Sequence, residues 1–283
     1  MTERVFIIGA GQVGRGLFRA FKPSGVELIG LHGHRPGPWT TSHGPLPIAM
    51  SNANTVVVAV RDEQIDDVLD ELIAERGRGR VASGTVVVHT SGGAEPELMP
   101  HLAQVGLSGG TFHPLVPFSN PERAPELLKR AWIGIDGDDQ ARATSRRLAG
   151  HLGARTLEIP AGAKGVYHAA AVMSSNFPVV LAAVATQMLA GLGIPERSAQ
   201  QAVHSLMEGA VSNIADRPAE EALTGPVIRG ETDTVRRHLE AVRGDPEARA
   251  VYKRMSLAAL EIAARAGTDP ERIEEIRKLL LLR

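Results

Sequence analysis

The chain has 283 residues, 43% of them hydrophobic and 22% charged, a composition typical of a soluble globular protein long enough for two domains. The net charge of -1 gives no basis for binding nucleic acid or a charged membrane surface, so we expect neither partner. The absence of cysteine excludes disulfides, thiolate metal sites and cysteine nucleophiles, and it fits a reducing cytoplasm.

A dinucleotide-binding pattern opens the chain. The apolar residues 5–8 predict a strand rather than a signal peptide, and Gly-Ala-Gly-Gln-Val-Gly follows, ahead of a predicted helix over residues 15–21. In this pattern Gly9 makes a tight turn, Gly11 lets the backbone approach a pyrophosphate, and Gly14 lets the helix pack closely on the strand. The phosphates would lie at the helix N-terminus, so we expect Gln12 and Val13 to contact the cofactor as well.

Strand and helix patterns alternate from there to Pro160. Repeated units of this kind predict a parallel, doubly wound α/β sheet that binds ligands at the carboxyl ends of its strands. Asp62 is expected to cap the helix after the third strand. The further predicted strands cover residues 26–31, 55–60, 85–89, 108–112, 132–135 and 156–159, and the further helices cover 62–72, 96–105 and 138–152.

After Pro160 the strand signal disappears. Long helices are predicted over residues 163–192 and 195–215, a Pro- and Gly-rich loop over 216–230, and a helix over 232–242. Asp-Pro-Glu at 245–247 and again at 269–271 marks two further helix starts. We therefore expect a Rossmann domain over residues 1–160 and an all-helical domain over residues 161–283.

The apolar run over residues 166–193 has nearly the length of a membrane span. His168, Gln187 and several other polar residues interrupt it, together with a proline. These interruptions favour a buried helix over a membrane-spanning one.

The end of the second predicted strand indicates which cofactor is bound. NAD-binding folds usually carry an acidic residue there, and this chain instead has His34 and Arg35. A guanidinium suits a 2′-phosphate, so we favour NADP over NAD; the alternative is that Arg35 is a solvated loop charge. Further cofactor contacts are expected where two later strands end; they are Val60, Arg61, Thr90, Ser91 and Gly92.

Candidate catalytic groups gather at the start of the long helix. A carbonyl or imine that accepts a hydride also needs a proton or a positive charge, which a lysine or histidine supplies. Lys164 opens the helix at the predicted domain junction, His168 shares its face, and Asn176 lies off to one side. Each also has a structural alternative: a solvated lysine, a satisfied core histidine, or an asparagine that binds a neighbouring helix.

Three further residues are candidates for substrate binding. His113 ends a predicted strand, and Thr224 and Arg229 lie in the loop Thr-Gly-Pro-Val-Ile-Arg-Gly. Arg229 is suited to a carboxylate or a phosphate. The alternative is a plain turn before the next helix.

Together these motifs resemble a known family. Its elements are Gly-Ala-Gly-Gln-Val-Gly, His-Thr-Ser-Gly at 89–92, His-Pro-Leu at 113–115, Tyr-His-Ala-Ala-Ala at 167–171, Ser-Asn-Phe at 175–177 and Leu-Thr-Gly-Pro-Val-Ile-Arg-Gly at 223–230. The chain resembles a family with a Rossmann-like NADP-binding domain fused to a helical domain of unknown function. It is more distantly similar to ketopantoate reductase, pyrroline-5-carboxylate reductase and deazaflavin-dependent NADP reductases.

This resemblance implies a helical domain of the 6-phosphogluconate-dehydrogenase C-terminal type, which is often dimeric. It also implies that the Thr224 loop resembles the substrate-side loop of the pyrroline-5-carboxylate reductases. The sequence thus predicts a cytoplasmic, homodimeric, NADP-dependent oxidoreductase acting on a small carbonyl or imine compound, without a metal. Lys164 or His168 would be the acid, and Asn176 would orient the substrate. The alternatives are a non-catalytic dinucleotide sensor and an enzyme whose hydride partner is a deazaflavin.

Overall fold

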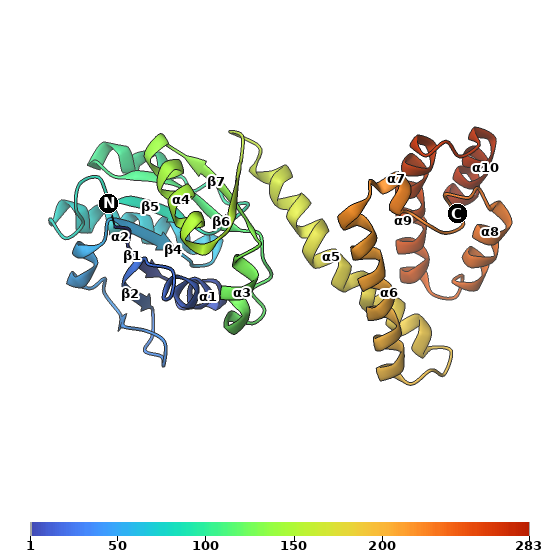
Figure 1. The fold of residues 1–283 in the computed structure, drawn as a ribbon, viewed down its shortest axis with the longest axis horizontal. Helices are drawn as coiled ribbons and strands as arrows, with labels where there is room; N and C mark the ends of the chain where they lie inside the picture. Colours follow the sequence, from blue (N-terminus) through green and yellow to red (C-terminus); the bar gives the residue numbers. More distant parts are fainter. Residues whose placement is uncertain (1, 283) are drawn as a thin grey trace. The chain divides into compact units, whose positions relative to one another are not determined.

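The computed structural model describes residues 2–282, and the chain divides into two compact units, Met1–Ser175 and Asn176–Arg283 (Figure 1). The sheet ends close to Pro160, where the sequence places the domain boundary. The first unit extends beyond that point because the first turns of helix α5 (Lys164–Ala190) make side-chain contacts with the strands.

An eight-stranded sheet forms the centre of the first unit, with strand order β3-β2-β1-β4-β5-β6-β7-β8 (Figure 1). This confirms the predicted doubly wound α/β class, but a fully parallel sheet is wrong because β7 runs antiparallel to β6. The connection between them, residues 115–131, contains only two short helices, so the chain returns directly beside β6. The strands are β1 (Arg4–Ile8), β2 (Glu27–Gly33), β3 (Ser42–His43), β4 (Thr55–Val58), β5 (Val86–His89), β6 (Ser108–Pro114), β7 (Trp132–Gly137) and β8 (Arg155–Glu158).

Two hydrophobic cores lie on the two faces of this sheet. Alternate residues of β1 enter different cores, Val5 and Ile7 one of them and Phe6 and Ile8 the other, as the two-residue period of a strand requires. Helices α1 (Gln12–Phe21), α3 (Ala124–Leu128) and α4 (Asp139–Leu152) contribute to the first core. The second core contains residues of α2 (Ile65–Gly77), η1 (Ile48–Asn52) and η3 (Met99–Val105).

Two local predictions in this unit are wrong. Asp62 does not cap α2, because Asp62–Gln64 forms a 3-10 turn (η2) and the preceding residues make no side-chain capping bond. The helix predicted over residues 96–105 is a 3-10 helix that begins at Met99. A further 3-10 segment, η4 (Pro121–Arg123), precedes α3.

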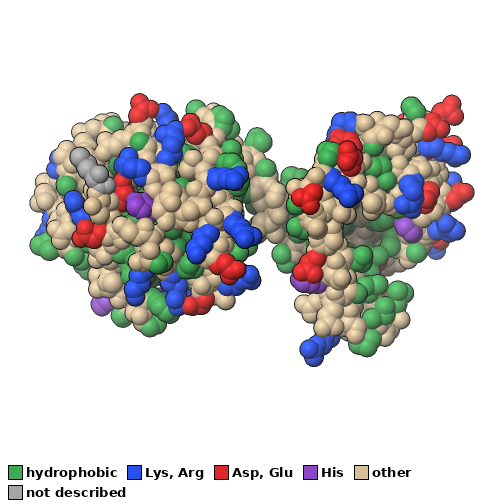
Figure 2. All heavy atoms as spheres, viewed as in Figure 1, with side chains coloured by type: hydrophobic (Ala, Val, Ile, Leu, Met, Phe, Trp, Pro, Cys, Tyr) green, Lys and Arg blue, Asp and Glu red, His purple; other side chains and the backbone are tan. Residues whose placement is uncertain are grey.

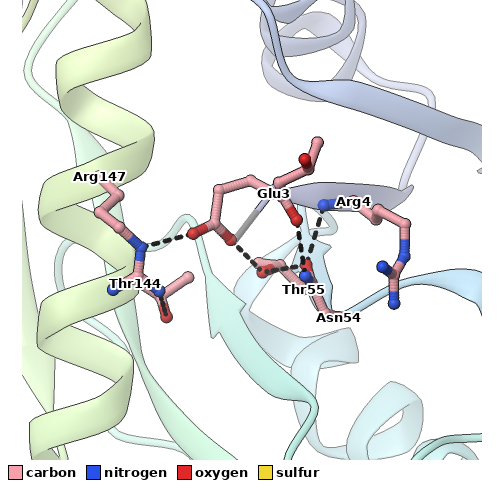
Figure 3. Close-up of polar contacts among 7 residues, drawn as sticks. Glu3, Arg4, Asn54, Thr55, Thr144 and Arg147 are labelled. Atoms are coloured by element: carbon pink, nitrogen blue, oxygen red, sulfur yellow. Dashed lines mark hydrogen bonds and ion pairs between the residues drawn. The ribbon is translucent and has the colours of Figure 1, made fainter.

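A buried carboxylate fastens α4 to the amino-terminal edge of the sheet (Figure 3). Glu3 is only 4% exposed, and it accepts hydrogen bonds from Arg147 on α4 and from the Thr55 hydroxyl at the start of β4. Asn54 beside it accepts a bond of 2.9 Å from the backbone N–H of Arg4. Because this network lies where the strands begin, it leaves the opposite edge, where the strands end, free for a ligand.

The second unit is helical, as predicted. Its core joins Val235, Leu260 and Ile276, one each from α8, α9 and α10. Asp245 and Asp269 cap α9 and α10, as their Asp-Pro-Glu signals predict, and each accepts a bond from a backbone N–H of the first turn. Besides the end of α5, the helices are α6 (Glu196–Asp216), α7 (Ala219–Ala222), α8 (Thr232–Ala241), α9 (Pro246–Arg265) and α10 (Pro270–Leu281).

Helix α5 is not the buried helix that the sequence predicts. Lys164 is its one buried residue in the described chain, and Val166 and Val179 are 79% and 69% exposed. Its apolar residues lie all around the helix, so one neighbouring element cannot cover them. By length and composition alone, α5 is also the one described helix that could cross a membrane, with a mean hydropathy of 1.6. Figure 2 shows hydrophobic side chains gathered where α5 ends and α6 begins.

Candidate active site

The loop after β1 has the geometry that a dinucleotide-binding turn requires. Gly9 has φ +110°, and a Cβ atom there would lie 2.2 Å from the carbonyl oxygen of Ala59. A Cβ atom at Gly14 would lie 1.8 Å from the carbonyl oxygen of Gly9, so α1 packs directly on the loop. Gly11 is exposed, and a Cβ atom there would meet nothing within 4 Å. Two glycines therefore shape the turn, and the third leaves its backbone open to a ligand.

A cavity of about 610 Å³ adjoins this loop. Most of the predicted cofactor residues line it: Gly9, Gly11, Gln12, Val13, His34, Val60 and Arg61. Gly14 lies buried beneath the loop, and Arg35 lies outside the lining. Three residues without a predicted role, His32, Asp67 and Glu71, also line the cavity. The signal for the two acids is their spacing on α2, one turn apart on the same face.

The cavity contains the uncapped N-terminus of helix α1 together with positively and negatively charged side chains. Gly11 precedes α1 without a side-chain cap, and the first turn of α1 has no acidic residue, so its N–H groups stay open to an anion. Arg61 is exposed and lies 3.3 Å from a carboxylate oxygen of Glu63. His32 lies 3.0 Å from both the Ser42 hydroxyl and the carbonyl of Gly44, and burial lowers the pKa of His32, which keeps it neutral.

Two glycines after β5 make room for two imidazole rings. A Cβ atom at Gly92 would lie 2.6 Å from the His113 ring, and one at Gly93 would lie 2.8 Å from Nδ1 of His168. The two rings are 6.0 Å apart between centroids and nearly perpendicular, at 84°. Buried Ser91 shapes the turn, since its hydroxyl accepts a bond of 3.3 Å from the N–H of Gly93. The structure thus brings together four predicted residues, Ser91, Gly92, His113 and His168.

Tyr167 joins this group as a residue without a predicted role. Its hydroxyl lies 2.8 Å from Nδ1 of His113, and the two rings meet edge to face with centroids 5.6 Å apart. Gly134 on β7 pairs with His113 on β6, and a Cβ atom there would lie 2.1 Å from the Tyr167 hydroxyl oxygen. The only sequence signal was that Tyr167 precedes His168 within the Tyr-His-Ala-Ala-Ala motif.

Burial changes the ionisation of both partners. Desolvation, together with the neighbouring His168, lowers the pKa of His113 from 6.5 to about 4. Desolvation raises the pKa of Tyr167 from 10.0 to about 12. At neutral pH the imidazole of His113 is therefore uncharged, and the phenol of Tyr167 keeps its proton.

Lys164 is held in a buried ion pair. The residue is 7% exposed, and its Nζ lies 3.0 Å from Oδ2 of Asp136 and donates a 3.0 Å bond to the carbonyl of Ala94. Nε2 of buried His89 lies 3.5 Å away and also contacts the hydroxyl of Thr111, at 3.1 Å. Burial and the charge of Lys164 lower the pKa of His89 to about 4. The lysine thus joins α5 to β7 and to the loop after β5.

The remaining predicted residues are surface or loop positions. Thr90 is buried directly after β5, with its backbone N–H bonded to the carbonyl of Val58. Asn176, Thr224 and Arg229 belong to the second unit and are exposed. Arg229 pairs with Glu231 at 2.6 Å. The substrate roles of these three residues stay predictions.

The comparison with protein families finds its match mainly in the second half of the chain. A family described as "domain of unknown function (DUF2520)" matches residues 131–259. This segment begins at β7 and reaches α9, so it includes Tyr167, His168 and all of α5. No curated protein matches the chain.

Solved structures match nearly the whole chain. Protein TM1727 from Thermotoga maritima is 24% identical with a TM-score of 0.70, covering 92% of this chain and 98% of its own. Pyrroline carboxylate reductase from Plasmodium falciparum, with NADP bound, is 13% identical with a TM-score of 0.61, covering 97% of this chain and 98% of its own. Imine reductase from Myxococcus stipitatus, in complex with NADP+, is 17% identical with a TM-score of 0.61, covering 96% of this chain and 99% of its own. A variant of that imine reductase is in complex with NAD+.

These matches establish the class of fold. The chain has a Rossmann-like domain followed by a helical domain, in the arrangement that its motifs predict. It therefore shares its architecture with proteins that carry NADP. At this level of sequence identity the match is evidence for the fold alone.

Proposed function

We propose that the protein is an NAD(P)-dependent oxidoreductase that transfers a hydride between nicotinamide and a small carbonyl or imine compound. The observation that carries this proposal is that one unit contains both a glycine loop left open at Gly11 and a histidine pair seated on Gly92 and Gly93. The loop follows β1, and the pair lies where β5 and β6 end, the edge at which such sheets bind ligands. The nicotinamide supplies the hydride when bound. The fold shared with NADP-carrying reductases supports the same reading.

Within this reaction, we assign the proton to His168. A carbonyl or imine that gains a hydride must also gain a proton, and an imidazole is suited to donate one near neutral pH. His168 is half-buried beside His113. Lys164 is the weaker candidate because its ammonium is already paired with Asp136 and with the carbonyl of Ala94. Asn176, Thr224 and Arg229 keep their proposed roles in orienting and binding the substrate.

We propose NADPH as the preferred cofactor, with Arg61 and His34 as the groups that read the 2′-phosphate. Both line the cavity beside the glycine loop, whereas Arg35 does not. Asp67 and Glu71 also line the cavity, and their negative charges would repel the 2′-phosphate. The preference for NADPH therefore depends on a cation in the same cavity. The assignment therefore moves from Arg35, which the sequence favours, to Arg61.

We propose a cytoplasmic homodimer in which the second copy covers α5 and α6. Leu206, Val211 and Ile214 on α6 are 74%, 62% and 63% exposed, and α5 adds Val179 and Val180. Large contiguous apolar patches are rare on monomers and typical of permanent interfaces, so the exposed apolar residues of α5 and α6 support this proposal. If a second copy covers α5, the exposed apolar residues of this helix are accounted for without placing it in a membrane.

A fluorescence titration of the full chain with NADPH and with NADH tests the cofactor proposal. We expect tighter binding of NADPH, and we expect Arg61→Ala to weaken it roughly 10-fold while changing NADH binding little, because one charge-assisted contact is lost. Arg35→Ala is the matched control, with a smaller effect. The reverse ranking would return the role to Arg35, and no binding of either nucleotide would overturn the proposal.

Turnover with a panel of small carbonyl and imine compounds tests the chemistry. We expect His168→Gln to lower kcat by roughly 100-fold or more, since general acid catalysis is worth about that much, with the NADPH Kd unchanged. His101→Gln, at an exposed histidine of η3, is the control. Tight NADPH binding without turnover on any compound would favour the non-catalytic sensor.

A further inference from the structure

A hydrogen bond joins the imidazole of His113 on β6 to the phenol of Tyr167 on α5. The Tyr167 hydroxyl and Nδ1 of His113 are 2.8 Å apart, and the rings stand at 81°. Both groups can donate or accept, so the distance alone does not say which atom carries the proton. The answer decides what the opposite nitrogen, Nε2 of His113, can do.

The relative acidities of the two groups settle the direction. A phenol is a much stronger acid than the N–H of a neutral imidazole, and an imidazole nitrogen is a stronger base than a phenol oxygen. A neutral pair therefore favours the arrangement in which the O–H donates to the ring nitrogen. Because burial holds the pKa of His113 at about 4 and raises that of Tyr167 to about 12, the pair is neutral across the physiological range.

Two glycines hold this arrangement in place. The His113 ring lies against the α-carbon of Gly92, and the phenol oxygen of Tyr167 lies over the α-carbon of Gly134. Gly134 is the register partner of His113 across the β6–β7 pair, so the strand pairing itself brings the phenol to the imidazole. A side chain at either glycine would displace one of the two rings. The backbone at these two glycines, rather than mobile side chains, therefore holds the rings of His113 and Tyr167 in place.

We propose that Tyr167 is a positioning residue whose hydroxyl donates to Nδ1 of His113 and fixes that ring as the neutral Nε2–H tautomer. His113 then presents a permanent hydrogen-bond donor instead of a base. Its catalytic use rests on the proposed function: Nε2–H would hold the oxygen or nitrogen of the substrate, while the neighbouring His168 delivers the proton. The two histidines would thus have different roles, His113 as a fixed hydrogen-bond donor and His168 as the proton donor.

The chain contains a matched control for this idea. In the second unit the Tyr252 hydroxyl lies 2.9 Å from Nδ1 of His238, with ring centroids 5.6 Å apart at 84°. The contact has nearly the same geometry as the proposed pair, but His238 is exposed and lies outside the proposed site. Any general effect of removing a tyrosine hydroxyl from a histidine should appear equally in Tyr252→Phe.

The test is the protonation pattern of the His113 ring, read from long-range proton–nitrogen NMR spectra of the full chain labelled with 15N-histidine. The His113 signals are assigned by their loss in His113→Gln. We expect a protonated Nε2 and a bare Nδ1 in the wild type, and a mixture of both tautomers in Tyr167→Phe. Tyr252→Phe should leave the His113 signals unchanged. A protonated Nδ1 in the wild type, or an unchanged pattern in Tyr167→Phe, would overturn the proposal.

Kinetics then separate this proposal from the proposed function. We expect Tyr167→Phe to lower kcat roughly 10-fold or more, because a wrongly protonated imidazole cannot donate, with NADPH affinity unchanged. Tyr252→Phe should turn over at the wild-type rate. If the ring is the Nε2–H tautomer but kcat in Tyr167→Phe equals that of the wild type, the positioning role is wrong although the reductase assignment stands. If no compound is turned over, the NMR result still decides the tautomer.

Discussion

The two units place their polar and apolar side chains in opposite ways. Among the described residues, the sheet unit buries many polar side chains, including His89, Thr111 and Lys164, whereas the helical unit buries only Ser256. Exposed large apolar side chains occur in both units but are more numerous in the helical unit, where Leu206 and Ile214 are examples. Buried polar groups cost stability unless they are paired, and exposed apolar patches call for a partner. The difference supports the two proposals made above, that the first unit carries the chemistry and that a second copy covers apolar side chains of the second.

Breaking the buried ion pair should give the largest loss of stability. In Lys164→Met the side chain keeps its length, but the carboxylate of Asp136 loses its partner in a mostly buried place. We expect the free energy of unfolding to fall by about 3 kcal/mol, measured by urea denaturation. The double variant Lys164→Met/Asp136→Leu should recover at least half of that loss. A single variant as stable as the wild type would show that the pair does not hold α5.

The glycine loop offers a second comparison, between two positions of one motif. Gly9→Val forces a branched side chain into φ +110° and against the carbonyl of Ala59, so we expect a loss of about 2–3 kcal/mol. Gly11→Val meets no neighbouring atom, so its stability should change by less than about 1 kcal/mol while its NADPH affinity falls. Denaturation and nucleotide titration on both variants check this. Equal stability losses at the two positions would contradict the division of roles.

Acid should weaken the sheet unit through its buried histidines. His89 and His113 have pKa values of about 4 in the folded protein, against 6.5 ordinarily. Between these values the unfolded chain binds more protons than the folded one, so stability falls as the pH drops from 6.5 towards 4. We expect a loss of about 1–3 kcal/mol between pH 7 and pH 4.5 in denaturation experiments. In His113→Gln the slope should be shallower, and a slope equal to that of the wild type would contradict the neutral state of His113.

The smallest effect on folding should come from the helical unit. Val179 is 69% exposed, so Val179→Glu should change the stability of one chain by less than about 0.5 kcal/mol. If a second copy covers α5, the same change buries a charge in the interface and should convert a dimer to a monomer. Analytical ultracentrifugation measures this directly. A wild-type protein that sediments as a monomer would contradict the homodimer.

Local signals in the sequence predicted much of this fold. The glycine spacing identifies the turn at Gly9 and the open position at Gly11, and Asp245 and Asp269 mark helix starts that the structure confirms. Each of these depends on residues within a few positions of one another. Asp62 shows the limit of such reasoning, because a 3-10 turn took the place of the expected first helical turn.

Features that depend on distant partners were not predictable. The direction of β7 is set by how the chain returns beside β6, which no pattern within β7 records. The ion pair of Lys164 with Asp136, and the bond of Tyr167 to His113, likewise join residues that lie far apart in the sequence. The exposure of α5 was not predicted for a different reason. An apolar helix has the same sequence pattern whether its own chain covers it or not, so the pattern alone predicts burial.

The reversed strand also determines where this chain can tolerate changes of length. Side chains alternate along β7, so inserting one residue ahead of Gly134 would move every later side chain to the opposite face of the sheet. The one insertion would therefore remove both the contact of Gly134 with the phenol of Tyr167 and the ion pair of Asp136 with Lys164. An insertion in the irregular connection of residues 115–131 changes neither register. Length variation is therefore expected in that connection, while the four residues from Gly134 to Gly137 keep a fixed spacing.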